Sequence, residues 1–200
     1  MIRLGLTGSI GMGKTTTAGL FAAAGIPVND ADQVVHDLYA GDAAPLVEAA
    51  FPGTVVDGVV DRQRLSRHLA AHPADFQKLE AIIHPLVRSR EARFLADQSE
   101  AGADIVVLDI PLLFETGATD RVDKVAVVTC DPQVQRQRVL ARPGMTEEKF
   151  NMILSRQLPD SEKRARADFL IDTGDGIEAA RSQVGAIIAA LKAQKTDGAL

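Results

Sequence analysis

A short glycine-rich stretch near the N-terminus constrains the fold of this chain more than any other feature. Residues 6–17 read "LTGSIGMGKTTT", and residues 8–15 within them match the spacing G-x-x-x-x-G-K-[ST]. A strand-like run, Ile2–Thr7, precedes the stretch, and a helical pattern from Lys14 to Ala24 follows it. Glycines in this setting let the backbone wrap around a phosphate with several N–H groups pointing inward. The sequence therefore predicts a nucleoside triphosphate site between the first strand and the first helix.

The residues of this loop have separate expected roles. Lys14 is expected to reach the β- and γ-phosphates, and the Thr15 hydroxyl is expected to bind Mg²⁺. The N-terminal end of the following helix adds a favourable partial charge for an anion. The predicted ATP-binding residues of the loop are Gly8, Gly11, Met12, Gly13, Lys14, Thr15 and Thr16.

A second strand-like run, "IVVLD" at Ile105–Asp109, ends in a carboxylate. Four apolar residues before the acid indicate a buried parallel strand, so Asp109 is expected to emerge at the carboxyl edge of the sheet. There it can hold the metal ion directly or through water. The alternative is a strand that ends in an acidic cap. Thr15 and Asp109 are the predicted metal residues.

The order of strand and helix patterns indicates an α/β fold with a parallel sheet flanked by helices. Further strands are expected at Lys124–Thr129 and Phe169–Asp172, with a weaker one at Ile26–Asp30, and the last helix is expected over Ile177–Lys195. The segment 32–101 interrupts this alternation because it is helix-rich, is punctuated by two His-Pro pairs, and contains little that is typical of a strand. We interpret it as a helical insertion that faces the substrate.

Basic residues concentrate in the segment 136–166, which holds eight of the 22 lysines and arginines of the chain. Arginines contact phosphate oxygens and stabilise charge on a transferring phosphoryl group. Arg138 and Arg142 are four residues apart and suit a lid that closes over ATP. We expect this lid to be mobile without nucleotide because its charges would lack partners. The alternative is a solvated helical face with pairs at i and i+4.

Two aspartates, Asp30 and Asp32, follow the second strand. Asp32 is a candidate to accept the proton of an attacking hydroxyl, as a positioned carboxylate does in phosphoryl transfer. The alternative is that Asp30 or Asp32 caps the helix that begins there.

Composition excludes several other classes of function. The net charge of −5 does not favour binding to nucleic-acid backbones. The single cysteine, Cys130, excludes an intrachain disulfide. No secretory signal or membrane-spanning run is visible, so we expect a cytoplasmic protein with no membrane partner. Neither N-K-x-D nor D-x-x-G occurs, which argues against a GTPase switch.

The ordered set "LTGSIGMGKTT", "DAD", "HPLVR", "DIPLLFE" and "IDTGDG" resembles the dephospho-CoA kinase family over nearly the whole chain. The resemblance implies ATP-dependent phosphorylation of the ribose 3′-hydroxyl of dephospho-CoA, the last step of CoA synthesis, with Mg²⁺ accompanying ATP. It implies that Asp32 is the base, that Lys14, Arg138 and Arg142 are also catalytic, and that Gly174 lies beside the adenine. Thr173 departs from an asparagine frequent in the family. The implied acceptor-binding residues are Asp32, His84, Leu112, Leu113, Phe114 and Glu115.

This resemblance implies one kinase domain over residues 1–200 with the P-loop kinase fold. Its parts would be a nucleotide-binding core (1–31, 102–135 and 167–200), a helical acceptor-binding insertion (32–101) and a short helical lid (136–166). ATP and dephospho-CoA are the expected small-molecule partners. The alternatives are another P-loop small-molecule kinase, such as a nucleoside monophosphate kinase, or a non-catalytic nucleotide-binding regulator. The sequence makes no prediction of oligomeric state.

Overall fold

The computed structural model describes the backbone of residues 1–197 and the side chains of residues 1–194. The chain divides into two compact units: unit 1 contains residues 1–29 and those from 98 onward, and unit 2 contains residues 30–97. The bounds of the insertion predicted at 32–101 thus differ by only a few residues from those of unit 2. Each unit has its own hydrophobic core.

A sheet with the strand order β2-β5-β1-β6-β7 forms the centre of unit 1. Its pairings of β1 with β5, β1 with β6, and β6 with β7 are all parallel. The strands are β1 (Ile2–Thr7), β2 (Val28–Asp30), β5 (Ile105–Asp109), β6 (Lys124–Thr129) and β7 (Phe169–Asp172). Every residue of β5 is buried, as the apolar run predicted.

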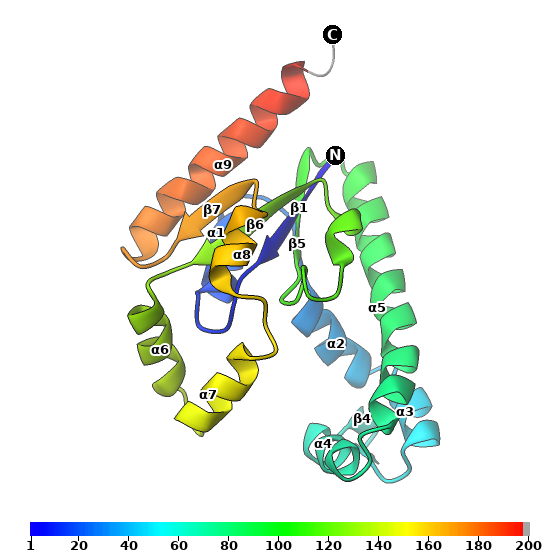
Figure 1. Ribbon diagram of the computed structural model, residues 1–200. Helices are drawn as coiled ribbons and strands as arrows, with labels where there is room; N and C mark the ends of the chain where they lie inside the picture. The colour runs from blue at the N-terminus through cyan, green and yellow to red at the C-terminus, as the bar shows by residue number, and fades with distance from the viewer. Residues whose placement is uncertain (198–200) are drawn as a thin grey trace. The chain divides into compact units, whose positions relative to one another are not determined.

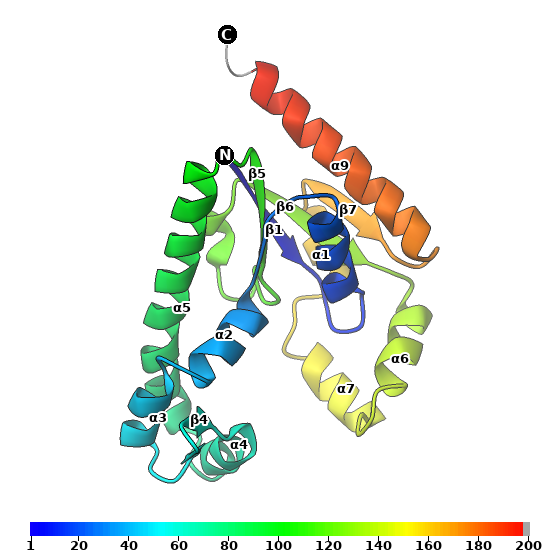
Figure 2. The same ribbon diagram turned by 180° about the vertical axis from the view of Figure 1, so that it is seen from behind.

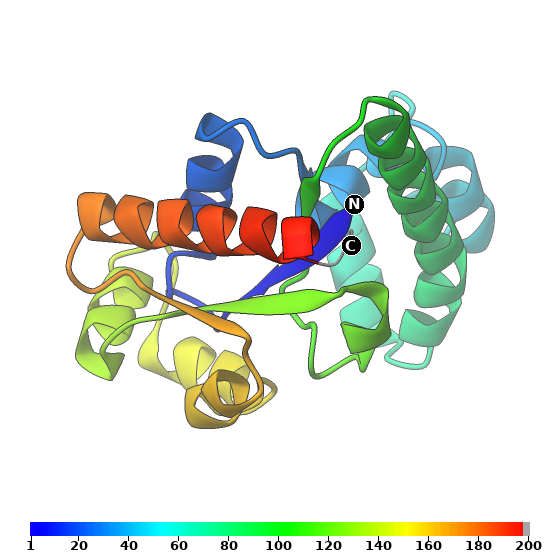
Figure 3. The same cartoon turned by 90° about the horizontal axis from the view of Figure 1, so that it is seen from above.

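Helices cover both faces of this sheet (Figures 1 and 3). Helices α1 (Lys14–Ala23) and α9 (Ile177–Asp197) share one core with the sheet, to which Leu4, Leu6 and Ile171 contribute. Figure 2 shows α1 from the opposite side. The other elements of unit 1 are η1 (Ala118–Arg121), α6 (Pro132–Leu140), α7 (Glu147–Leu154) and α8 (Asp160–Ala165).

Unit 2 is mostly helical, with Leu38, Val47, Phe51 and Leu65 among its fully buried residues. Its elements are α2 (Ala31–Tyr39), α3 (Ala44–Ala50), β3 (Val55–Val56), β4 (Val59–Val60), α4 (Arg62–Ala71) and α5, which spans Asp75–Glu100 and so continues into unit 1. In Figures 1 and 2, α2, α3 and α4 gather around the first half of α5.

Two local features of unit 2 differ from the sequence expectation. Strands β3 and β4 form an antiparallel hairpin, whose turn places Asp57 and Gly58 at φ values of 50° and 79°. An Asp-Gly pair between β-branched residues favours this turn, but two-residue strands are too short to show periodicity. The His84-Pro85 pair does not interrupt the helical structure of the segment either, because Pro85 lies inside α5. His72-Pro73 does separate α4 from α5.

Candidate active site

The loop between β1 and α1 is packed so closely that its glycines are required. A Cβ atom on Gly8 would lie 2.7 Å from the carbonyl oxygen of Val128. At Gly11 the φ angle is +79°, and a Cβ atom there would lie 2.4 Å from Cγ2 of Val139. Any side chain at Gly11 would therefore meet both backbone strain and a clash with α6. The loop is thereby held against β6 and α6.

Lys14 and Asp109, predicted for different roles, lie together in the structure. The Lys14 ammonium forms an ion pair with Oδ1 of Asp109. Asp109 ends β5 and its side chain is 1% exposed, whereas Thr15 at the start of α1 is exposed. The structure thus brings a cation that can contact phosphate next to a carboxylate that can serve a metal ion.

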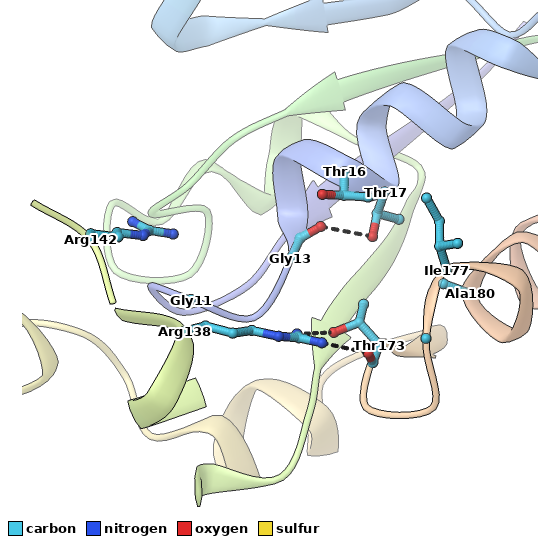
Figure 4. A pocket seen from close by; sticks show the side chains of 10 residues that line it. Gly11, Gly13, Thr16, Thr17, Arg138, Arg142, Thr173, Ile177 and Ala180 are labelled. Atoms are coloured by element: carbon cyan, nitrogen blue, oxygen red, sulfur yellow. Dashed lines mark hydrogen bonds between the residues drawn. The ribbon is translucent and has the colours of Figure 1, made fainter. Parts of the chain in front are cut away.

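A cavity of about 310 Å³ lies beside the loop in unit 1. Arg138 of α6 reaches across it and donates two hydrogen bonds of 2.8 Å, to the hydroxyl and the carbonyl oxygen of Thr173 (Figure 4). Arg142 also lines the cavity, which brings together the two predicted lid arginines. The remaining lining residues are Gly11, Gly13, Thr16, Thr17, Gly176, Ile177 and Ala180.

Thr173 connects the loop after β7 to the phosphate loop. Its hydroxyl donates to the carbonyl oxygen of Met12 over 2.7 Å while it accepts from Arg138. Gly174 lies next to it and donates its N–H to Asp172 Oδ1. The residue that departs from the family pattern is therefore buried and hydrogen-bonded in this cavity wall.

The expectation that the charges of the lid segment lack partners is wrong for five of its eight basic residues. Their partners are Glu147 for Arg136, Thr173 for Arg138, the Gly144 carbonyl for Lys149, Glu115 for Lys163 and Glu162 for Arg166. Only the Arg166–Glu162 pair has the i,i+4 spacing of the alternative interpretation. The mobility of the segment stays a prediction, but unpartnered charges no longer support it.

Glu115 of the "PLLFE" segment lies against a buried lysine. Lys163 of α8 is fully buried, and its Nζ lies 2.8 Å from Oε1 of Glu115, which also accepts the N–H of Leu158. Burial of Glu115 opposes its ionisation, but the hydrogen bonds from Lys163 and Leu158 more than offset this effect and lower its pKa. The pair joins the loop after β5 to α8.

The other residues of this segment differ in exposure. Leu113 is fully buried near Gly5, whereas Leu112 is 40% exposed. The guanidinium of Arg166 lies over the ring of Phe114 at 5.9 Å. Of these residues, Leu112 offers the most accessible apolar surface, and acceptor binding by the segment stays a prediction.

Asp30, not Asp32, caps helix α2. Its Oδ1 accepts the N–H groups of Asp32 and Gln33 at 2.9 and 3.1 Å. The Asp32 side chain lines a cavity of about 520 Å³ within unit 2. The capping alternative for Asp32 is therefore excluded, and its carboxylate is available for chemistry.

Arg62 and Tyr39 face the same cavity and were not identified from the sequence. The Arg62 guanidinium lies 5.5 Å from the centre of the Tyr39 ring. Burial raises the pKa of Tyr39, although the charge of Arg62 opposes this shift. Neither Asp32 nor Arg62 forms an ion pair within the part of the chain that the structure describes. The other lining residues are Val35, Leu65, Ser66, Leu69, Phe76 and Leu79.

The histidines of unit 2 lie outside this cavity lining. His84 is exposed on α5. His68 Nε2 lies 2.7 Å from Oδ2 of Asp75, and its ring stacks on that of His72. Nitrogen and oxygen atoms of these last three residues lie within 4.8 Å of one another. The hydrogen bond between His68 and Asp75 joins α4 to the start of α5.

A phosphate loop between a buried parallel strand and a helix, with its lysine beside an acidic strand end, defines a P-loop nucleotide-binding fold. The chain belongs to the dephospho-CoA kinase family, whose model matches residues 2–179. The predictions of fold class, family and kinase activity are confirmed.

Curated relatives agree over almost the full length of the chain. A dephospho-CoA kinase from Rhizobium etli is 65% identical over 198 residues, which cover 99% of this chain and 98% of the relative. One from Agrobacterium fabrum is 62% identical over 193 residues, which cover 96% and 100%.

Two solved structures share the fold. A crystal structure from Thermus thermophilus matches with a TM-score of 0.80 and 32% identity, covering 94% of this chain and 96% of that one. A dephospho-CoA kinase from Campylobacter jejuni matches with a TM-score of 0.69 and 22% identity, covering 94% and 95%. No helix among the described residues is long and apolar enough to cross a membrane.

Proposed function

We propose that the protein transfers the γ-phosphoryl group of ATP to the 3′-hydroxyl of the ribose of dephospho-CoA, giving CoA and ADP. The observation that carries this proposal is the family match over residues 2–179, which includes an intact phosphate loop. A nucleoside monophosphate kinase or a non-catalytic regulator is not favoured by these relatives.

ATP binds in unit 1. Main-chain N–H groups of Gly8–Thr15, with Thr16 beside them, hold the phosphates, and Lys14 leaves Asp109 to contact the β- and γ-phosphates. The cavity beside the loop, with Ile177 and Ala180 as apolar lining and Gly174 close by, accommodates the nucleoside. Arg138 and Arg142 on its opposite wall are suited to stabilise the charge of the transferring group.

The donor set at Thr15 and Asp109 fits Mg²⁺, which prefers hydroxyl and carboxylate oxygens. Because Asp109 is 1% exposed, we expect it to act through water. When bound, the ion neutralises charge on the β- and γ-phosphate oxygens. The residues of this chain supply the remaining contacts.

Dephospho-CoA binds in the cavity of unit 2. Its acyclic pantetheine arm is suited to the apolar lining around Leu65, Leu69 and Phe76, and its diphosphate is suited to Arg62. His84 and residues 112–115 remain predicted acceptor contacts. The cavity thus offers both the apolar surface and the cation that this substrate requires.

Asp32 accepts the proton of the 3′-hydroxyl as the hydroxyl oxygen attacks the γ-phosphorus of ATP. The bond from that phosphorus to the β,γ-bridging oxygen breaks, and ADP leaves with the electron pair. This step needs one carboxylate near the acceptor hydroxyl and cations near the phosphates. Asp32 and the trio Lys14, Arg138 and Arg142 fill these roles.

The test is an ADP-release assay with ATP and dephospho-CoA, with AMP and CMP as competing acceptors and the product site mapped to the 3′ position. Of these acceptors, we expect only dephospho-CoA to be phosphorylated by ATP. Transfer to AMP or CMP in its place would support the monophosphate-kinase alternative. ATP binding without transfer to any acceptor would support the regulator. The cytoplasmic location and the lack of nucleic-acid partners stay predictions.

A further inference from the structure

Both main-chain groups of Ile10, in the middle of the phosphate loop, are bonded by glutamine side chains. The Ile10 N–H donates to Oε1 of Gln157 over 3.1 Å. Nε2 of Gln135 donates to the Ile10 carbonyl oxygen over 2.8 Å. A peptide N–H can only donate and a carbonyl can only accept, so the backbone itself determines how each amide is oriented. Neither glutamine belongs to the phosphate-loop motif.

Gln135 directly precedes the segment that the sequence identified as a lid (136–166), and Gln157 lies inside that segment. Gln135 lies on α6 and is 6% exposed. Gln157 lies between α7 and α8, where the chain is fixed by further contacts. Leu158 donates to Glu115, and the Thr129 hydroxyl donates to Oδ2 of Asp160 over 2.7 Å. The part of the segment between the two glutamines, residues 136–156, is therefore attached to Ile10 on both sides.

We propose that Gln135 and Gln157 are positioning residues that fix the peptide groups on both sides of Ile10 and so keep the phosphate loop in its ATP-accepting form. A rotation of these peptides would turn the N–H groups of the following residues away from the phosphates. A misplacement of about 1 Å in such a site costs about 10²-fold in rate. This inference rests on the proposed function, since the loop is taken to bind ATP.

The two glutamines are predicted to respond in opposite ways to the same substitution. Gln157→Glu keeps an oxygen that accepts the Ile10 N–H. Gln135→Glu replaces a donor with a carboxylate that faces the Ile10 carbonyl oxygen. Both variants add one negative charge near the same loop, so each controls for the effect of charge on ATP binding. The geometry, not the charge, then decides the difference.

We expect Gln135→Glu to weaken ADP binding and to raise the KM for ATP about tenfold or more, the effect of an unsatisfied buried polar group. Gln157→Leu, which removes the acceptor, should act in the same direction. Gln157→Glu should keep most of the ADP affinity that Gln157→Leu loses, and its KM for ATP should be closer to that of the wild type. The KM for dephospho-CoA should change little in each variant, whereas a general loss of folding would affect both substrates.

ADP affinity by calorimetry and the thermal unfolding midpoint are measured for every variant beside the kinetics. Equal effects of Gln157→Glu and Gln157→Leu would overturn the proposal. So would lower unfolding midpoints with an unchanged affinity for ADP in the folded variants. If Gln135→Glu does not fold, the comparison of Gln157→Glu with Gln157→Leu still tests the proposal. A wild-type protein that binds ADP but does not phosphorylate dephospho-CoA would refute the proposed function, while the glutamine variants still test the loop through ADP affinity.

Discussion

The phosphate-loop region of unit 1 and the cavity around Asp32 in unit 2 differ in how their polar groups are satisfied. In unit 1, Lys14 is paired with Asp109, and Arg138 is bonded twice to Thr173. In unit 2, Asp32 and Arg62 line a largely apolar cavity without an ion pair among the described residues.

The difference separates stability from activity. A paired, buried group contributes to the free energy of folding because its removal leaves a partner unsatisfied. The Asp32 carboxylate has no side-chain partner among the described residues, and Arg62 has only weak ones, a 3.5 Å contact with His36 and the Tyr39 ring, so removing either group should cost little folding free energy. Substitution of Asp32 or Arg62 should therefore act mainly on kinetics, and substitution of Lys14 or Arg138 should change kinetics and stability together.

The largest effect is expected for Asp32→Asn. Loss of the base should lower kcat by about 10²-fold or more, while ATP affinity and the thermal unfolding midpoint remain close to those of the wild type. The matched control is Asp30→Asn, which keeps a side-chain oxygen that caps α2. A combined loss of kcat and stability in Asp32→Asn would show that Asp32 is structural and would break the comparison.

Lys14→Ala should follow, with a loss of about 10²-fold in kcat/KM for ATP. The variant removes a phosphate contact and also leaves Asp109 without its lysine, so the unfolding midpoint should fall as well. Lys124→Ala is the control because its ion pair with Asp168 is exposed. Unchanged affinity for ATP by calorimetry would contradict the assignment of Lys14.

Glu115→Gln should destabilise unit 1 by about 3 kcal/mol at pH 7, because Lys163 would stay buried without a counterion. The folded-state pKa of Glu115 is lowered from its ordinary value of 4.5, so the stabilisation is present above that value. It is lost as the pH falls through the folded-state pKa. Urea unfolding at several pH values should show the difference between wild type and variant shrinking below about pH 4.5.

The exposed pair of Arg181 with Glu178 provides the control for this measurement. Glu178→Gln should change stability by less than about 0.5 kcal/mol. A difference between wild type and Glu115→Gln that is independent of pH would contradict the role of the carboxylate charge.

The smallest effect is expected for Arg62→Ala. Loss of a charged hydrogen bond of about 1.5 kcal/mol should raise the KM for dephospho-CoA about tenfold. The KM for ATP should not change, and the unfolding midpoint should fall only slightly, because Arg62 loses a 3.5 Å contact with His36 and its contact with the Tyr39 ring. Arg67→Ala, on the same helix but outside the cavity lining, is the control. Equal effects of the two variants would remove Arg62 from the acceptor site.

Sequence reasoning succeeded where local chemistry decides the structure. Strands β1, β5, β6 and β7 have the bounds that their sequence patterns predicted. The reason is clearest for β5, whose residues are all buried, because a strand buried on both faces is apolar along its length. The weaker strand expected at Ile26–Asp30 is shorter, at Val28–Asp30. The residues of the phosphate loop are likewise contiguous in the sequence, so their spacing alone predicts a nucleotide-binding site.

It failed where residues distant in the sequence meet. The cavity of unit 2 draws Asp32, Arg62 and Phe76 from three helices, and no spacing in the sequence relates them. Lys163 resembled the other cations of its segment, yet it is fully buried beside Glu115. Gln157 gave no signal at all, since a glutamine between two helices has no distinctive pattern.

The contact of Gly11 with Val139 also limits how this enzyme can diverge. A residue larger than glycine at position 11 requires a smaller one at position 139, and only residues that tolerate a φ of +79° could then be accepted. A change at position 11 therefore depends on a prior change at position 139, which most of the chain separates from it. In a library randomised at both, survivors other than glycine should be rare and should always carry a shortened partner on α6.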